Sequence, residues 1–336
     1  MLTATLFSRT RHQRRLPGRY RPARQQRGVA IITALLIVTI AATVSISIST
    51  RLQLDVRRTS NLIALDQAQF YLLAAEEWSQ RILRQDKKDS KSDDLTESWA
   101  IQLPPLPVDG GSIQGTLTDL HACININSLV KDEAMNKTTQ LQLDLLFGNL
   151  GINSGSGGKL IPAIKDWIDI DLETTNPGGA EDGYYLNLEH PYRTANTELR
   201  SISELRLIKG FEDSETYLKV RPYLCAFDSN RESTAINVNT AGIEVLKSLS
   251  QAITDSVAGD ILERREEAPF ADVKEFTRFA KLDTILKDTK HLTTSSDYFL
   301  LRTHARIGQA STIMYSIIHR DEAGKTSIIS RSQRTL

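Results

Sequence analysis

A long uncharged segment near the N-terminus constrains this chain of 336 residues more than any other feature. No charged side chain occurs between Arg27 and Arg51, and residues 29–50 are mostly Ile, Leu, Val, Ala, Ser and Thr. As an α-helix these residues would extend about 33 Å, which is enough to cross a hydrocarbon core about 30 Å thick. We therefore predict a transmembrane helix over residues 29–50.

Charge is distributed unevenly on the two sides of this segment. Residues 1–28 hold eight arginines and no acidic residue, whereas the remaining residues hold 41 Asp and Glu against 33 Lys and Arg. Because basic residues stay on the cytoplasmic side of a membrane, we expect a single-pass inner-membrane protein with a cytoplasmic N-terminus and a periplasmic body. The acidic body also argues against a nucleic-acid partner, because DNA and RNA are polyanions.

The position of Gly28 distinguishes three interpretations of the N-terminus. A secretory signal peptide would be cut after the apolar run, but the sequence at Ala41-Ala42-Thr43 is a poor cleavage site. A plain signal anchor would not be cut at all. Gly28, however, lies between the arginines and the apolar run, so that a cut after it would remove the basic leader and keep the helix.

The helix is expected to continue beyond the membrane. No Pro or Gly occurs from Val29 to Leu103, and apolar residues recur between Ile63 and Leu83 with a spacing nearer to 3.6 than to 2 residues. We predict an amphipathic extension over residues 51–88. Its apolar stripe indicates that other parts of the chain pack on it.

The string RQQRG-VAIITALLIV resembles the leader of type IV prepilins. The resemblance implies cleavage between Gly28 and Val29 by a prepilin peptidase, followed by methylation of the new N-terminus. Most such proteins carry Glu at the fifth position of the membrane helix, where this chain has Thr33. The K-type minor pseudopilins of the type II secretion system lack that Glu, and the chain resembles this family from its leader to its last strands.

The order of the remaining segments predicts an α+β fold. Residues 89–124 and 289–336 contain alternating strand patterns, whereas residues 125–288 read mainly as helices. We expect a pilin-like long N-terminal helix packed on a small antiparallel sheet, with a large, mostly α-helical domain inserted between the early and late strands. Residues 1–28 would then be the basic prepilin leader.

An acidic loop is the most specific feature of the soluble part. Residues 166–185, DWIDIDLETTNPGGAEDGYY, gather six carboxylates around a Pro-Gly-Gly turn. Hard oxygen ligands grouped in this way suit Ca²⁺, although a solvated acidic loop has a similar composition. The family resemblance favours calcium, and it implies a ligand set that we take as the prediction: Asp169, Asp171, Glu181, Asp182 and, more weakly, Asn196.

The two cysteines, Cys123 and Cys225, flank the acidic loop. In the periplasm they would meet an oxidising environment, and a disulfide would connect the two ends of an inserted segment. Two unrelated buried thiols are the alternative. We expect the disulfide.

Residues 235–280 suggest a competing function. They resemble a helix-hairpin-helix module that binds the DNA backbone, so a membrane-anchored DNA-binding protein is the alternative. The hairpin at residues 250–254 lacks the usual glycine pair, however. We find no metalloprotease histidine spacing and no G-x-S-x-G, and the Gly-Ser segment 152–159 lacks the end of a P-loop, so we expect no enzyme.

The family resemblance implies a structural function. A K-type minor pseudopilin would cap the tip of a short periplasmic pseudopilus and help to start its assembly. The implied partners are the I-type and J-type minor pseudopilins, other pseudopilins, the prepilin peptidase, the inner-membrane assembly platform and exported proteins.

Overall fold

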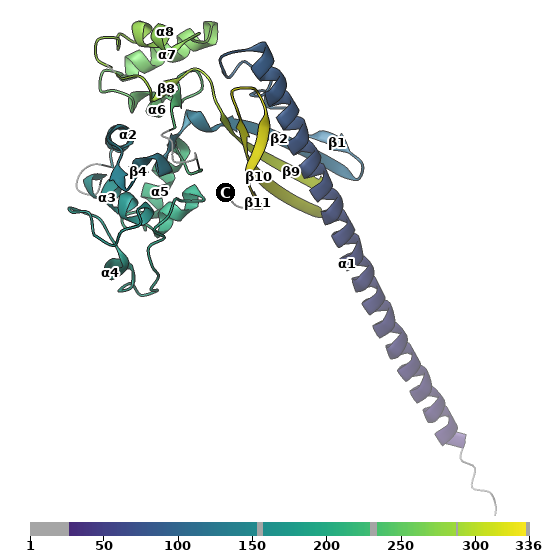
Figure 1. The fold of residues 1–336 in the computed structure, drawn as a ribbon. Coiled ribbons are helices and arrows are strands. Elements are labelled where there is room, and N and C mark those ends of the chain that lie inside the picture. The colour runs from purple at the N-terminus through teal and green to yellow at the C-terminus, as the bar shows by residue number, and fades with distance from the viewer. Residues whose placement is uncertain (1–26, 153–156, 229–233, 287, 334–336) are drawn as a thin grey trace, which may run out of the picture. The chain divides into compact units, whose positions relative to one another are not determined.

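The computed structural model describes residues 27–152, 157–228, 234–286 and 288–333 (Figure 1). These residues form two units, one ending at Ser60 and one beginning at Asn61. The predicted leader, residues 1–28, lies outside the described residues except for its last two positions.

A single helix, α1 (Arg27–Asp89), contains both the predicted span and its amphipathic extension. Its N-terminal part is long and apolar enough to cross a membrane, with a mean hydropathy of 2.6 over an 18-residue window. The hydroxyl groups of five residues in this part donate to main-chain oxygens three or four residues earlier, which satisfies these groups without water. These donors are Thr33, Thr39, Thr43, Ser45 and Thr50.

The sheet has five antiparallel strands in the order β1-β2-β9-β10-β11. The strands are β1 (Leu106–Val108), β2 (Gly111–Asp119), β9 (Tyr298–Ile307), β10 (Ala310–Arg320) and β11 (Thr326–Gln333). The C-terminal part of α1 packs on this sheet through two apolar clusters (Figure 1). One cluster joins Ala68 and Leu72 to Met314, and the other joins Leu83 to Phe299 and Ile318.

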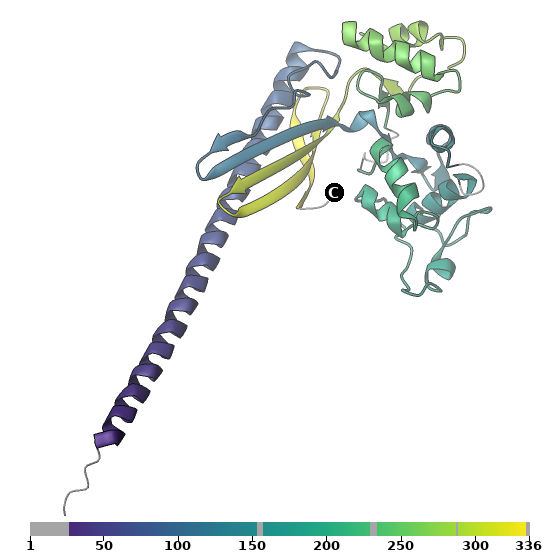
Figure 2. The same cartoon turned by 180° about the vertical axis from the view of Figure 1, so that it is seen from behind.

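The mainly helical region lies in the sequence between β2 and β9. Figure 2 shows it beside the end of the sheet at which β2 ends and β9 begins. Its helices are α2 (Lys137–Asn149), α3 (Gly157–Ile168), α4 (Asp182–Tyr185), α5 (Ser214–Val220), α6 (Ile243–Lys247), α7 (Asp255–Glu267) and α8 (Val273–Phe279). They share one large apolar core that includes Phe147, Trp167, Phe211 and Phe276. The α+β class is therefore confirmed.

Three pairs of short strands join segments of this region in the part of the chain that the structure describes. β3 (Ile124–Asn125) pairs in parallel with β6 (Leu224–Cys225), and β7 (Ile236–Asn237) pairs in parallel with β8 (Leu292–Thr293). β4 (Val130–Lys131) and β5 (Ala134–Met135) form a tight hairpin. The C-terminal part of the five-stranded sheet accordingly begins at Tyr298, because β8 pairs within the helical region.

A buried polar network connects this region to α1 and the sheet. Arg320 on β10 is fully buried and donates to Asp86 of α1, to Asp93 and to the main-chain oxygen of Ser296. Asn237 donates to the main-chain oxygen of Asp93 and to the side chain of Ser296. The end of α1, the loop after it and the entry to β9 are therefore held together by hydrogen bonds that water cannot replace.

Candidate metal centre

The acidic loop begins at the end of α3 and returns to the core at α4. Asp166 lies on α3, Asp169 follows its last residue, and Glu181 immediately precedes α4. Trp167 packs edge-on against Tyr185, with the ring centroids 5.3 Å apart, so the two ends of the loop are fixed to each other. The fold thus brings together carboxylates that are twelve or more residues apart in the sequence.

Three carboxylates converge inside the protein. Oxygen atoms of Asp166, Asp169 and Glu181 all lie within 4.8 Å of one another, and all three residues are buried. Three like charges this close, away from water, repel one another unless a cation or protons compensate them. Within the residues described, the basic side chain paired with this triad is Lys165, which forms an ion pair with Asp169.

Burial and mutual repulsion change the acidity of these groups. Burial, followed by the charge of Asp166, raises the pKa of Glu181 to about 7. Burial also raises the pKa of Asp169, although Lys165 opposes this change. Burial works against the charge of Lys165, but its hydrogen bond to Asp169 raises the pKa of that lysine. At neutral pH the buried triad is therefore stabilised by bound protons or by a bound cation.

Several oxygen atoms at this place lack a hydrogen-bond donor. Asp169 Oδ1, Glu181 Oε1 and Asn196 Oδ1 are buried and have no partner in the described structure. The amide nitrogen of Asn196 donates to the main-chain oxygen of Asp171, at 3.4 Å, which holds the Asn196 side chain against the acidic loop. Buried oxygens without donors are rare in native proteins, and carboxylate and amide oxygens are the ligands that Ca²⁺ prefers. The donor set therefore fits a calcium ion.

The remaining predicted ligands are used differently. Asp171 is exposed, and its Oδ1 accepts a hydrogen bond from the main-chain nitrogen of Glu173 at 2.7 Å. Asp182 accepts from the main-chain nitrogen and the hydroxyl of Thr194, and it pairs with Arg193 at 3.1 Å. Both carboxylates thus stabilise loop geometry, and neither belongs to the buried triad.

Asp166, which the predicted ligand set did not include, is the third member of the buried triad. It is fully buried, and its carboxylate accepts from the main-chain nitrogen of Thr175 at 3.0 Å. A Cβ atom at Gly179 would lie 2.1 Å from Asp166 Oδ2, so this close approach requires glycine. Its position three residues before Asp169, on one helix face, is the sequence signal that could have identified it.

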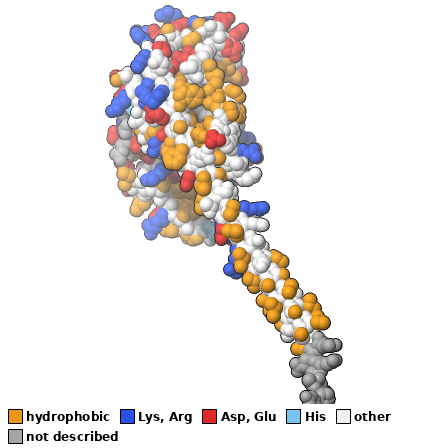
Figure 3. All heavy atoms as spheres, turned by 90° about the vertical axis from the view of Figure 1, so that its right-hand side faces the viewer, with side chains coloured by type: hydrophobic (Ala, Val, Ile, Leu, Met, Phe, Trp, Pro, Cys, Tyr) orange, Lys and Arg blue, Asp and Glu red, His pale blue; other side chains and the backbone are white. Residues whose placement is uncertain are grey.

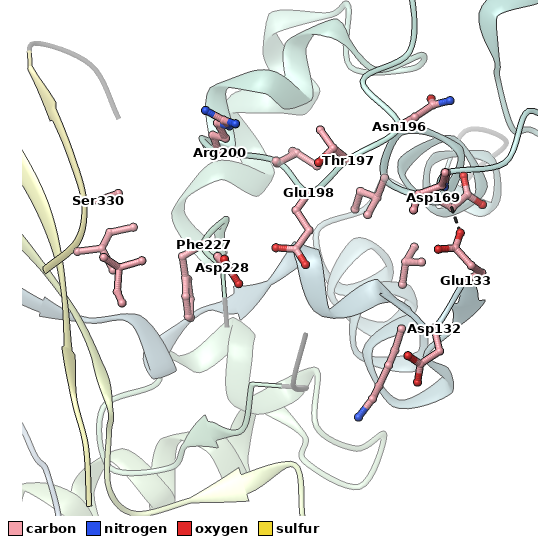
Figure 4. Close-up of a pocket in the computed structure, with 17 residues that line it drawn as sticks. Asp132, Glu133, Asp169, Asn196, Thr197, Glu198, Arg200, Phe227, Asp228 and Ser330 are labelled. Atoms are coloured by element: carbon pink, nitrogen blue, oxygen red, sulfur yellow. Dashed lines mark hydrogen bonds between the residues drawn. The ribbon is translucent and has the colours of Figure 1, made fainter. Parts of the chain in front are cut away.

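Asp169 and Asn196 also line one end of a larger cleft, with a volume of about 740 Å³ (Figure 4). Glu133, from the β4–β5 hairpin, lies beside Asp169 and accepts a hydrogen bond from the main-chain nitrogen of Ile170 at 3.2 Å. Asp132 and Glu133 both have positive φ angles, 50° and 62°. Ser330 of β11 lies at the opposite end of the cleft.

Polar residues of the segment that resembles a DNA-binding hairpin form hydrogen bonds within the protein itself. Asn239 forms two hydrogen bonds with the main chain of Phe270, and Asn127 forms the same pair with Leu199. Arg265 donates to the main-chain oxygens of Val238 and Ala241. Asn127 and Asn239 thus each fix a distant chain segment through the same pair of hydrogen bonds.

The structure joins Cys123 and Cys225 by a disulfide, with their Cα atoms 5.8 Å apart. These residues adjoin β3 and β6, so the covalent bond closes the segment that carries the acidic loop. A disulfide of this kind stabilises a fold mainly by limiting the conformations of the unfolded chain.

Comparison with known proteins identifies the family. Two family models, both described as type II secretion system (T2SS), protein K, match residues 122–229 and 236–295. Type II secretion system protein K of Aeromonas hydrophila is 33% identical over 324 residues, which cover 92% of this chain and 97% of the relative. This chain belongs to the type II secretion system protein K family. It is a minor pseudopilin of that system, and the DNA-binding alternative is not supported.

Other protein K relatives agree. The protein of Pseudomonas aeruginosa is 29% identical over 316 residues, covering 92% of this chain and 93% of the relative. A solved structure described as the GspK-GspI-GspJ complex from enterotoxigenic Escherichia coli contains a chain that is 27% identical. It superposes with a TM-score of 0.72, covering 83% of this chain and 100% of that one.

Proposed function

We propose that this protein K family member is a non-catalytic cap at the tip of a periplasmic pseudopilus. The observation that carries the proposal is the insertion of residues 120–297 between β2 and β9 of a pilin-like helix-and-sheet unit. Arg320 donates hydrogen bonds both to Asp86, near the C-terminal end of α1, and to the main-chain oxygen of Ser296, just before β9. The insertion is therefore held at the C-terminal end of α1. A bulky insertion at that end would obstruct a subunit stacked above, which suits the last subunit of a fibre.

The proposed partners follow from the family. The solved relative forms a complex with GspI and GspJ, so we propose I-type and J-type minor pseudopilins as neighbours of this chain. Other pseudopilins, the prepilin peptidase, the inner-membrane assembly platform and exported proteins complete the proposed set. The N-terminus would be cytoplasmic and the body periplasmic, as the arginine-rich leader predicts.

Processing after Gly28 is part of this proposal. A Cβ atom at Gly28 would meet no atom within 4 Å, so the helix itself has no need for glycine there. A glycine that the helix does not require favours a role in recognition by the peptidase. The hydroxyl of Thr33 is already bonded to the oxygens of Val29 and Ala30, so it offers no charge to a neighbour's amine.

N-terminal sequencing and intact mass of the protein from its membrane test this proposal. We expect a chain that begins at Val29 with a methylated amine, and a chain that begins at Met1 would contradict it. Gly28→Val should block processing and secretion, whereas Thr33→Glu should leave secretion largely intact. Normal secretion from unprocessed Gly28→Val would also overturn the proposal.

We propose further that the buried triad binds Ca²⁺. Asp166, Asp169 and Glu181, with Asn196 as a further oxygen donor, would hold the ion. Its positive charge would compensate their repulsion and fix the loop. Calorimetric titration of the protein with Ca²⁺, after treatment with a chelator, tests this assignment. Asp169→Asn should abolish binding, while exposed Glu189→Gln should bind normally. Unchanged binding by Asp169→Asn would contradict the proposal.

A further inference from the structure

Lys165 lies on α3 at a position from which its side chain reaches the buried triad. The main-chain nitrogen of Asp169 donates to the main-chain oxygen of Lys165 at 2.9 Å, so one helical turn separates the two residues and their side chains share one face. The ammonium group of Lys165 donates a hydrogen bond to Asp169 Oδ2 and forms an ion pair with it. The Lys165 side chain is 14% exposed, whereas that of Asp169 is fully buried.

One ammonium group does not compensate three carboxylates. Although Lys165 binds Oδ2 of Asp169, Oδ1 of Asp169 and Oε1 of Glu181 remain buried without a donor. Asp166 accepts from the main-chain nitrogen of Thr175, which carries no full charge. Repulsion within the triad therefore persists beside Lys165. The lysine is a partial counter-ion, and a doubly charged cation would compensate the triad better.

Burial distinguishes this ion pair from those on the surface. Figure 3 shows basic and acidic side chains interspersed on one face of the molecule, where water and salt weaken their attraction. Lys219 and Glu215 on α5 form an exposed pair with the same spacing of four residues, and their side chains are 49% and 72% exposed. The pair of Lys165 and Asp169 lies largely out of water, so its charges act strongly on any ion placed beside them.

A calcium ion and the ammonium group of Lys165 compete for Asp169. Ca²⁺ takes six to eight oxygen ligands and often binds both oxygens of a carboxylate, so an ion at the triad would gain from Oδ2, which Lys165 holds. Two cations on one carboxylate would also repel each other, because little water separates them. The lysine has a flexible four-carbon stem and some access to water, so its ammonium group can leave the triad when an ion enters.

We propose that Lys165 is an internal competitor of the calcium ion, which displaces the ammonium group from Asp169 when it binds. The inference rests on the proposed calcium site, because it describes how that site exchanges one cation for another. Without calcium, Lys165 reduces the repulsion within the triad. Exchange of the ammonium group for a monovalent ion adds no positive charge, whereas exchange for Ca²⁺ adds one. The lysine therefore also favours divalent ions at this site.

Calorimetric titration of the detergent-solubilised full chain with Ca²⁺ tests the inference. We expect Lys165→Met to bind Ca²⁺ roughly tenfold more tightly than the unaltered chain, because a like charge beside the ion is removed. Lys165→Arg keeps the charge and should bind no more tightly than the unaltered chain. Lys219→Met, which removes the lysine of the exposed pair on α5, is the matched control and should bind like the unaltered chain.

Two outcomes of the titration separate this inference from the proposal on which it rests. Equal or weaker binding of Ca²⁺ by Lys165→Met would overturn the inference and leave the calcium site in place. If the unaltered chain binds no Ca²⁺, the proposed site fails and the inference fails with it.

A second measurement uses the unaltered chain, because Lys165→Met leaves the triad without its own cation in chelator. An amine-acylating reagent, followed by mass spectrometry, reports how accessible each lysine is. We expect Lys165 to be acylated faster in Ca²⁺ than in chelator, whereas Lys219 should react equally in both. Equal acylation of Lys165 in the two conditions, in a sample that binds Ca²⁺ in the calorimeter, would show that the ammonium group stays in place and would overturn the inference.

Discussion

Two buried acidic clusters in this protein have similar composition and different surroundings. One contains Asp86, Asp93 and Glu97, and the other contains Asp166, Asp169 and Glu181. In the first, the guanidinium of Arg320 contacts both aspartates and stacks over Phe299, 4.9 Å from the ring centroid. We call the first the Arg320 cluster and the second the loop triad.

The hydrogen bonds differ in the same way. In the Arg320 cluster, Asp93 also accepts from the main-chain nitrogen of Ser296, and Glu97 accepts from the indole of Trp99. In the loop triad, Asp169 and Glu181 each keep a buried oxygen without a donor. The chain thus supplies hydrogen-bond donors to carboxylates of the Arg320 cluster, whereas it leaves two buried carboxylate oxygens of the loop triad without a donor. The comparison shows that open oxygens, more than acidic composition, identify a candidate ion site.

Removing the cation of the first cluster should have the largest effect. Arg320→Met leaves Asp86 and Asp93 buried without their counter-ion, and we expect a loss of about 3–5 kcal/mol in the free energy of unfolding. Urea unfolding of the detergent-solubilised protein measures this loss. The matched control is Arg302→Met on β9, where the side chain is exposed and the expected change is within about 0.5 kcal/mol. Equal losses in the two variants would contradict our account of the Arg320 cluster.

Chelation should affect only the loop triad. At a free Ca²⁺ concentration 100 times the dissociation constant, binding stabilises a protein by about 2.7 kcal/mol. We expect a chelator to remove this stabilisation from the unaltered protein and from Arg302→Met. Asp169→Asn should be insensitive to the chelator. A response in Asp169→Asn equal to that of the unaltered chain would place the ion elsewhere.

A methyl group added next to Asp166 tests whether this residue is needed in the loop triad. In Gly179→Ala the new methyl group would displace Asp166, so we expect a cost of about 1–3 kcal/mol and weaker Ca²⁺ binding. Gly183→Ala is the control, because its Cβ atom would meet nothing within 4 Å. Thermal unfolding with and without Ca²⁺ measures both effects. Normal Ca²⁺ stabilisation of Gly179→Ala would show that Asp166 is not required.

The smallest effect is a dependence on pH. A carboxyl group with a raised pKa keeps its proton in the folded state where the unfolded chain has lost it, so stability falls as pH rises. For Glu181 this range runs from about 4.5 to about 7, and in chelator we expect a loss of about 1–2 kcal/mol across it.

Calcium should reverse this trend, because the ion binds the ionised triad and its affinity increases as the carboxylates lose their protons. Burial also raises the pKa of Asp86 to about 7, but that contribution is the same with and without Ca²⁺. Unfolding curves at pH 5 and pH 7 measure the difference. Parallel pH profiles in calcium and in chelator would argue against a role for Glu181.

Much of the fold was predictable because its signals are local. The uncharged run before Arg51 and the absence of Gly and Pro up to Leu103 predicted the long helix α1. Alternation after Tyr298 predicted the C-terminal strands. Of the predicted ligands, Asp169 and Glu181 belong to the buried triad and Asn196 keeps a buried oxygen without a donor, whereas Asp171 and Asp182 lie outside the triad, and the ligand set itself stays a prediction.

The sequence by itself determined the long apolar N-terminal helix, the α+β class and the family, because hydropathy, periodicity and motif order are properties of the linear chain. The tertiary structure decided which acidic residues face one another. Asp166 becomes a member of the loop triad only because Gly179 allows a close approach, and Asp86 is neutralised by an arginine more than two hundred residues away. Electrostatic interactions depend on distances in space and on exclusion of water, and both are fixed only when the chain has folded.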